Sequence, residues 1–147
     1  MNRWLLKTEP ETYGWSTLVA AGRGTWDGVR NPRARAYLGR MQPGDEAFFY
    51  HTGKSKAVVG VVRVVSQPFP DPTDADGHFL AVEVEPVREL ARPVTLAEVK
   101  ASPLFADMTL VTAARLSVQK VSQMHWDAIV ALSEQPGPPV RRTTRTS

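Results

Sequence analysis

The sequence from residue 46 to residue 65 reads EAFFYHTGKSKAVVGVVRVV and contains two segments that are typical of β-strands. Residues 46–51 and 58–65 are rich in aromatic and β-branched side chains, and the turn residues Pro43-Gly44-Asp45 precede the first segment. The second segment is apolar on both of its faces, which predicts a strand in the centre of a sheet. A β-sheet is therefore the expected core of the fold.

Shorter strands are predicted on both sides of this pair. Residues 3–7 favour a strand that the turn at Pro10 interrupts, residues 80–85 alternate between apolar and polar side chains, and residues 116–121 favour a last strand. Residues 68–74, in contrast, contain three prolines within five residues. This composition predicts a stiff surface loop without regular structure.

Four short helices are predicted, and each begins with a capping residue whose side-chain oxygen can accept a hydrogen bond from an N–H group of the first turn. The expected caps are Ser16 (helix 16–21, ending at Gly22), Asn31 (followed by Pro32 at the first helical position), Thr95 (helix 96–101) and Ser122 (last helix). Because strands outnumber helices, we predict an α+β fold with a curled or barrel-like antiparallel sheet and helices on its ends.

The length and composition indicate one domain. A chain of 147 residues that is 42% hydrophobic can bury one core, which we place in residues 1–134, followed by a disordered Arg- and Pro-rich tail over residues 135–147. The absence of cysteine excludes disulfides and thiolate metal sites and fits a cytoplasmic location. The first ten residues match neither a signal peptide nor a membrane span, so we expect no membrane association.

The charge is distributed unevenly along the chain. The net charge of +3 equals the contribution of Arg141, Arg142 and Arg145 in the tail, because the other fifteen basic residues balance fifteen acidic ones. Residues 1–63 carry ten basic and five acidic groups, whereas residues 64–140 carry five basic and ten acidic groups. This asymmetry indicates one basic face, unless the two halves intermix in space and their charges cancel.

Residues 25–35 combine the side chains that a pocket for a nucleic-acid base requires. An aromatic face such as that of Trp26 can stack on a base, the amide of Asn31 can read its edge, and Arg30 can bind phosphate. Arg33 and Arg35 add positive charge at the start of a helix, where backbone N–H groups also favour an anion. The structural alternative is that Trp26 belongs to the core and that the arginines form a solvated helix face.

A second candidate patch lies where the first aromatic strand runs into a polar loop. Tyr50 and His51 at the strand end could line a pocket, and Lys54 and Lys56 in the loop could contact a nucleic-acid backbone. A lone histidine is, however, more often a hydrogen-bonded structural residue than a ligand-binding one.

Signals for metal-dependent or nucleotide-dependent catalysis are absent from the sequence. The three histidines have no metal-binding spacing, and a zinc deaminase is excluded because there is no cysteine. The sequence contains neither a nucleophile elbow nor a phosphate-binding P-loop. We therefore expect no metal, no cofactor and no catalysis.

Six segments of the chain resemble, in the same order, the successive signatures of the EVE domain family. They are Trp4-Leu5-Leu6-Lys7-Thr8-Glu9-Pro10, Trp26-Asp27-Gly28-Val29-Arg30-Asn31, Met41-Gln42-Pro43-Gly44-Asp45, Phe48-Phe49-Tyr50-His51, Pro70-Asp71-Pro72 and Arg115-Leu116-Ser117-Val118-Gln119. The resemblance spans about residues 3–133. Several motifs in register make it far more specific than any single one of them.

The resemblance implies a PUA-like mixed or antiparallel β-barrel with flanking short helices, related to YTH and ASCH domains. It also implies a reader of a modified base, either a modified cytosine in DNA or a modified base in RNA. The pocket residues that it implies are Lys7, Thr8, Trp26, Arg30, Asn31, Tyr50, His51, Thr52, Arg115 and Ser117. Thr8 and Thr52 stand where the family frequently has serine, and Pro32 stands where it frequently has an aromatic residue.

Two alternatives to a reader remain open. Related ASCH-type domains include hydrolases of acylated cytidine, and Lys7, Thr8 and Glu9 supply the residue types that those enzymes use. Neighbours on a strand face opposite ways, however, so that Thr8 would point away from the other two side chains. The other alternative is a protein interaction module that docks through residues 68–74 or through the arginine tail.

Overall fold

The computed structural model of this chain describes residues 1–136. The predicted tail, including Arg141, Arg142 and Arg145, lies almost entirely outside the described residues. Within residues 1–136, no helix is both long and apolar enough to span a membrane.

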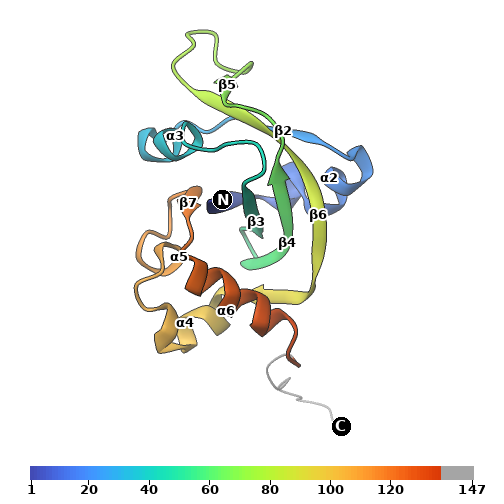
Figure 1. Cartoon of the computed structure of the whole chain (residues 1–147), viewed down its shortest axis with the longest axis vertical. Helices are drawn as coiled ribbons and strands as arrows, with labels where there is room; N and C mark the ends of the chain where they lie inside the picture. Colours follow the sequence, from blue (N-terminus) through green and yellow to red (C-terminus); the bar gives the residue numbers. More distant parts are fainter. Residues whose placement is uncertain (137–147) are drawn as a thin grey trace.

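A seven-stranded mixed sheet curls into a half-barrel (Figure 1). Its strand order is β2-β6-β4-β3-β1-β7, and β5 pairs separately with β6. β1 and β3 run parallel, whereas the other paired strands are antiparallel. The strands are β1 (Arg3–Thr8), β2 (Gly24–Trp26), β3 (Glu46–His51), β4 (Ala57–Val64), β5 (Phe69–Pro70), β6 (Leu80–Thr95) and β7 (Val118–Lys120). The predictions of a sheet core and of a central strand over residues 58–65 are confirmed, since β4 lies between β3 and β6.

Two strand predictions need correction. The strand predicted over residues 80–85 continues to Thr95 as β6, because prolines and charged residues after position 85 hide its pattern while β4 pairs with it as far as Thr95. The proline-rich loop is not free of regular structure, because Phe69 and Pro70 form β5 against Ala81 and Leu80. Proline is tolerated there because β5 has a neighbour on one side only, so that the missing N–H costs no ladder bond.

Short helices cover the ends of the barrel, with α3 near one end and α4 and α6 together at the other (Figure 1). The predicted caps Asn31, Thr95 and Ser122 are confirmed, and Thr95 forms a reciprocal capping box with Glu98. The cap predicted at Ser16 is wrong, because α2 already begins at Trp15 and its N-cap has no side-chain bond. The helices are α1 (Pro10–Tyr13), α2 (Trp15–Ala21), α3 (Pro32–Leu38), α4 (Leu96–Ala101), the 3-10 turn η1 (Pro103–Phe105), α5 (Thr109–Thr112) and α6 (Gln123–Ser133).

The buried side chains form two clusters on opposite faces of the sheet. Phe49 belongs to the cluster that also holds Trp26, and the adjacent Phe48 belongs to the other, where it stacks on Trp126 with a centroid distance of 3.8 Å. Side chains of neighbouring strand residues point to opposite faces, which explains the division. Gly60 in β4 leaves room for Trp15, because a Cβ at this position would lie 2.5 Å from the indole ring.

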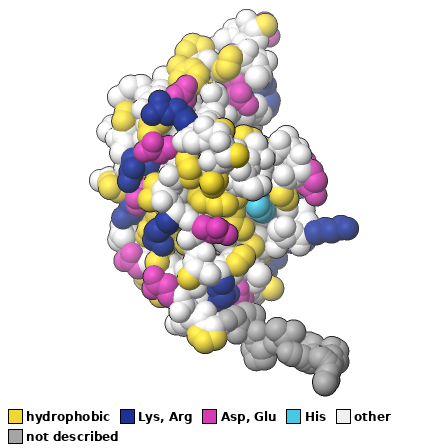
Figure 2. All heavy atoms as spheres, turned by 90° about the vertical axis from the view of Figure 1, so that its right-hand side faces the viewer, with side chains coloured by type: hydrophobic (Ala, Val, Ile, Leu, Met, Phe, Trp, Pro, Cys, Tyr) yellow, Lys and Arg dark blue, Asp and Glu magenta, His cyan; other side chains and the backbone are white. Residues whose placement is uncertain are grey.

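The basic face that the charge asymmetry indicates does not extend over β6 and α2 (Figure 2). Along β6 the two halves of the sequence meet and form ion pairs, Arg23–Glu83 at 3.6 Å and Arg63–Glu85 at 3.0 Å. On the face of the molecule that carries β6 and α2, basic and acidic side chains are interspersed (Figure 2). On this face the alternative holds, and the charges intermix.

Candidate functional site

A cavity of about 500 Å³ lies where β1 ends and where β2 passes into the loop before α3. This volume falls in the range of sites that hold small ligands, about 300–1,000 Å³. The cavity is lined by Lys7, Thr8, Thr12, Tyr13, Thr25, Trp26, Asp27, Gly28, Val29, Arg30 and Ser117.

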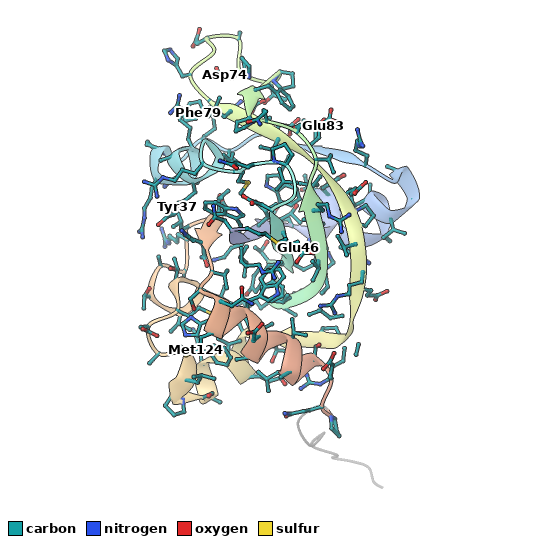
Figure 3. All side chains as sticks on the ribbon, in the orientation of Figure 1. Tyr37, Glu46, Asp74, Phe79, Glu83 and Met124 are labelled. Carbon is teal, nitrogen blue, oxygen red and sulfur yellow. The ribbon has the colours of Figure 1, made fainter. Side chains whose placement is uncertain are left out.

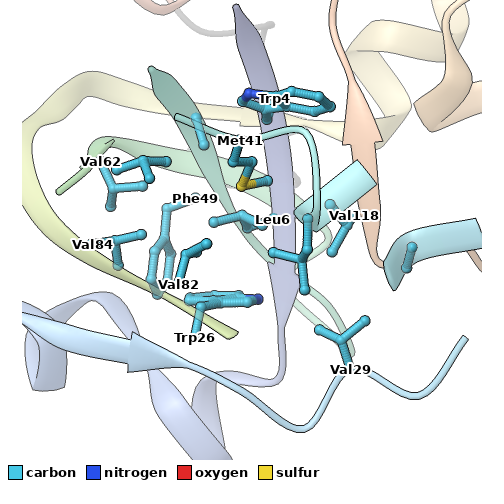
Figure 4. Packing of buried hydrophobic residues seen from close by; sticks show 14 of the residues in the cluster. Trp4, Leu6, Trp26, Val29, Met41, Phe49, Val62, Val82, Val84 and Val118 are labelled. Carbon is cyan, nitrogen blue, oxygen red and sulfur yellow. The ribbon is translucent and has the colours of Figure 1, made fainter. Parts of the chain in front are cut away.

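Trp26 is both a core residue and a wall of this cavity. Its side chain is 6% exposed, and its ring meets Phe49 edge to face with centroids 5.5 Å apart (Figure 4). Tyr13 packs against the same ring at 6.0 Å and also lines the cavity. The indole therefore has the rigid support that a stacking surface requires.

The loop after Trp26 is held in place by a buried carboxylate, Asp71. This side chain is 1% exposed and accepts hydrogen bonds from the Gly28 N–H at 2.7 Å and from Arg30 Nη1 at 3.0 Å. The N–H of Thr73 and its hydroxyl donate to the other carboxylate oxygen at 2.7 and 2.6 Å. Burial alone would raise the pKa of Asp71, but these hydrogen bonds lower it to about 2.

Asp71 joins the cavity wall to the loop that follows β5. That loop, which carries Asp74 and Phe79, projects at one end of the molecule (Figure 3). Arg30 also donates to Thr73 Oγ1 at 2.9 Å, and its guanidinium lies 5.2 Å above the ring of Phe79. Arg30 therefore lines the cavity, but its hydrogen bonds serve to position the loop.

The structure brings half of the predicted pocket residues together. Lys7, Thr8, Trp26, Arg30 and Ser117 line the cavity. The other predicted residues lie outside its lining, and these are Asn31, Tyr50, His51, Thr52 and Arg115.

Three of the residues outside the lining have structural contacts instead. The Asn31 Oδ1 atom accepts from the N–H groups of Arg33 and Ala34 at 2.8 and 3.1 Å, so this oxygen caps α3 and is not presented to a base. His51 Nε2 accepts from the Trp15 N–H at 3.1 Å, as the structural alternative expects, and burial lowers the pKa of this imidazole. Tyr50 is buried in the opposite core cluster.

The remaining two differ in their distance from the cavity. The N–H of Thr52 donates to the carbonyl of Thr8 at 2.8 Å, which ties the loop after β3 to the cavity wall. Arg115 is exposed and does not line the cavity.

The four predicted backbone contacts, Arg33, Arg35, Lys54 and Lys56, are all exposed. Arg35 Nε donates to the carbonyl of His78 at 2.6 Å. Lys54 and Lys56 line a separate depression of about 360 Å³ together with Lys100. The part of the chain that the structure describes contains no group of three or more His, Asp or Glu side chains that could hold a metal ion.

The sequence did not identify six lining residues, and it assigned no role to Asp71; the six are Thr12, Tyr13, Thr25, Asp27, Gly28 and Val29. The motif Pro70-Asp71-Pro72 marked Asp71 as part of the family pattern but did not identify its partner. Position offers a signal for Thr25, Asp27 and Val29, because they lie within three residues of Trp26, whereas Thr12 and Tyr13 come from α1 and only the fold brings them to the cavity.

Gly28→Ala is expected to lower the free energy of unfolding by about 1–2 kcal/mol, because Gly28 has φ +77°, a conformation that side chains with a Cβ disfavour. No atom lies within 4 Å of the position where the new Cβ would lie, so backbone strain alone causes the loss. Urea denaturation measures it. Gly39→Ala is the matched control: Gly39 has φ −64° in the helical region, and this variant should be neutral or slightly stabilised. Equal losses in both variants would contradict the assignment of strain to Gly28.

The fold of the chain is of the PUA-like type. The ASCH protein ZmASCH of Zymomonas mobilis, only 12% identical, superimposes with a TM-score of 0.55 over 90% of this chain and 99% of that chain. A family model described as the EVE domain matches residues 2–132, and the chain belongs to this family. The identification suggested by the six sequence motifs is therefore confirmed.

Relatives of the chain include proteins from animals and bacteria. Thymocyte nuclear protein 1 of Mus musculus is 35% identical, and the match covers 90% of this chain and 74% of the relative. A crystal structure from Agrobacterium tumefaciens is 38% identical with a TM-score of 0.87 over 95% of this chain and 97% of that chain. The human THYN1 protein in complex with DNA containing 5-methylcytosine is 31% identical, with a TM-score of 0.85 over 93% of this chain and 100% of that chain.

Proposed function

We propose that this chain binds nucleic acid and holds a modified base in the cavity beside Trp26, with 5-methylcytosine in DNA as the leading candidate and without catalysing a reaction. The observation that carries the proposal is the cavity itself, of about 500 Å³ and walled by a rigidly supported indole. The similarity to a human protein solved with 5-methylcytosine DNA supports the choice of ligand.

The lining offers both surfaces that a methylated base needs. A base stacked on an aromatic side chain gains about 1–3 kcal/mol irrespective of its identity. Trp26 supplies this surface, and Val29 adds an aliphatic side chain that a methyl group can contact. A base that is paired and stacked within a double helix cannot enter such a cavity. The target nucleotide must therefore be extruded from the helix or already be single-stranded.

The loop after β3 lies beside this cavity and can contact the phosphate backbone. Thr52 is bonded to Thr8 in the cavity wall, and Lys54 and Lys56 follow within four residues. Lysine contacts to phosphate add affinity that does not depend on sequence and that falls as the salt concentration rises. We propose this role for the two lysines, with Lys100 beside them.

The geometry does not favour the hydrolase alternative. The ammonium group of Lys7 donates to the carbonyl of Ala114 at 2.5 Å, and the Thr8 hydroxyl donates to the carbonyl of Tyr13 at 3.0 Å. Glu9 is exposed and does not line the cavity. The three groups are thus directed to separate partners, which supports the proposal of binding without catalysis.

An oligonucleotide with one central 5-methylcytosine is expected to bind about ten- to hundredfold more tightly than the same strand with cytosine, because one methyl group in an apolar site is worth about 1–3 kcal/mol. Fluorescence anisotropy at one fixed salt concentration measures both affinities. The same pair of sequences as RNA decides between the two nucleic acids. Equal affinities for the methylated and unmethylated strands in both backbones would overturn the proposed function.

A further inference from the structure

Asp27 is the acidic side chain of the cavity lining that has no cationic partner. Within residues 1–136, none of the ion pairs involves it. The cations nearest to it in the lining are directed elsewhere: Lys7 donates to Ala114, and Arg30 donates to Asp71 and Thr73. Asp27 is exposed at the cavity wall, so its carboxylate oxygens are available to the donor groups of a ligand.

The environment of Asp27 disfavours its charge. Burial and the neighbouring carboxylate of Asp71 raise the pKa of Asp27, and the charge of Arg30 and a hydrogen bond from the backbone N–H of Asp27 itself offset this only in part. A structural role would place a donor against such a carboxylate, as Gly28, Arg30 and Thr73 are placed against Asp71. The carboxylate of Asp27, in contrast, is exposed and lines the cavity, where a donor group of a bound ligand can replace the water around it.

A second polar group of the same wall also lacks a partner. The hydroxyl of Tyr13 is buried and forms no hydrogen bond with any described residue. Burial and the charge of Asp27 raise its pKa, which means that the two side chains are near enough to interact. The accessible carboxylate of Asp27 beside the stacking face of Trp26 favours a ligand that is planar and carries hydrogen-bond donors at its edge.

Hydrogen-bond chemistry then selects among the bases. Cytosine presents the donor N4–H₂ at its exocyclic position, and a carboxylate pairs with it; thymine and uracil present the acceptor O4 at the same position, which a carboxylate repels. Trp26 and Asp27 are consecutive and both line the cavity, so a ring stacked on the indole has the carboxylate available at its edge.

We infer that Asp27 accepts a hydrogen bond from the exocyclic amino group of the bound base and so restricts the cavity to bases of the cytosine type. This inference rests on the proposed function, because it assigns the edge of the base that the cavity holds. It identifies a second property that the site reads: the methyl group distinguishes 5-methylcytosine from cytosine, and Asp27 distinguishes it from thymine, which carries the same methyl group.

The test compares the affinities of two oligonucleotides that differ at one position, which is 5-methylcytosine in one and thymine in the other. Both are single strands, so that no opposing base contributes to binding. The wild-type protein is expected to favour 5-methylcytosine at least about tenfold, since a hydrogen bond to a charged group is worth about 1.5–3 kcal/mol. Asp27→Asn should reduce this ratio to about threefold or less, because an amide can pair with either exocyclic group. Asp76→Asn, at an exposed carboxylate outside the cavity lining, should leave the ratio unchanged.

The outcomes separate this inference from the proposed function. A folded Asp27→Asn variant that keeps the wild-type ratio overturns the role of Asp27, as does a wild-type protein that prefers methylcytosine to cytosine but not to thymine. A wild-type protein that rejects thymine yet binds cytosine and 5-methylcytosine equally overturns recognition of the methyl group. In that case, a reduced preference for 5-methylcytosine over thymine in Asp27→Asn still supports the contact with the amino group. Thermal denaturation of each variant verifies that it is folded.

Discussion

Trp26→Ala is expected to lower the free energy of unfolding by about 3–5 kcal/mol and to abolish the preference for the methylated strand. The stability loss follows from burial: the indole is 6% exposed and packs edge to face on Phe49 and Tyr13, so its removal leaves a hole in the core cluster. The loss of preference follows from the same ring, because it forms the stacking wall of the cavity. Urea denaturation measures the first effect and anisotropy the second.

A control in the other core cluster separates the two effects. Trp126 is 4% exposed and stacks on Phe48, so Trp126→Ala should cost a similar amount of stability. It does not line the cavity, and at about 10 °C, near maximum stability, the folded variant should keep the wild-type preference. Trp26→Phe keeps an aromatic face and should retain part of the preference for the methylated strand. A folded Trp26→Ala protein with undiminished preference would remove the indole from the proposed site.

Asp71→Ala is expected to cost about 3 kcal/mol of stability and to weaken binding of every oligonucleotide. The substitution removes the acceptor of four hydrogen bonds, from the Gly28 N–H, the Arg30 guanidinium and the N–H and hydroxyl of Thr73, and each such bond contributes about 0.5–1.5 kcal/mol. Binding falls because the cavity wall from Gly28 to Arg30 loses its anchor. Denaturation at neutral pH and anisotropy measure the two losses.

The same carboxylate predicts the acid sensitivity of the fold. The pKa of Asp71 is about 2 in the folded chain against an ordinary value of 3.8. A carboxyl group whose pKa is depressed on folding stabilises the protein fully above its unfolded pKa, and this contribution is lost as the pH falls from 3.8 toward 2. Asp71→Asn should lack this part of the acid transition, whereas Asp76→Asn should retain it. An acid transition unchanged in Asp71→Asn would contradict this account.

The sequence determined the local parts of the structure. Aromatic and β-branched residues marked β3 and β4. Three of the four predicted caps were correct because their hydrogen bonds join residues two or three positions apart, as in Asn31 with Arg33 and Ala34. Several motifs in one order identified the EVE family before any geometry was known. Such signals are readable because they depend on neighbours along the chain.

Only the tertiary structure decided which side chains surround the cavity. Asp71 binds Gly28 across 43 positions and Arg30 across 41, so no local pattern could show that a residue of the proline-rich loop anchors the wall beside Trp26. Asn31 has the chemistry to read a base, but its oxygen is already bonded within its own helix. Asp27 stood within a family motif without an assigned role, and folding places it at the cavity beside Trp26, where it belongs to none of the ion pairs of the described residues. Residue type specifies what a group can do, whereas distance and prior bonding decide whether it remains available, and these are set when distant segments of the chain close around one space.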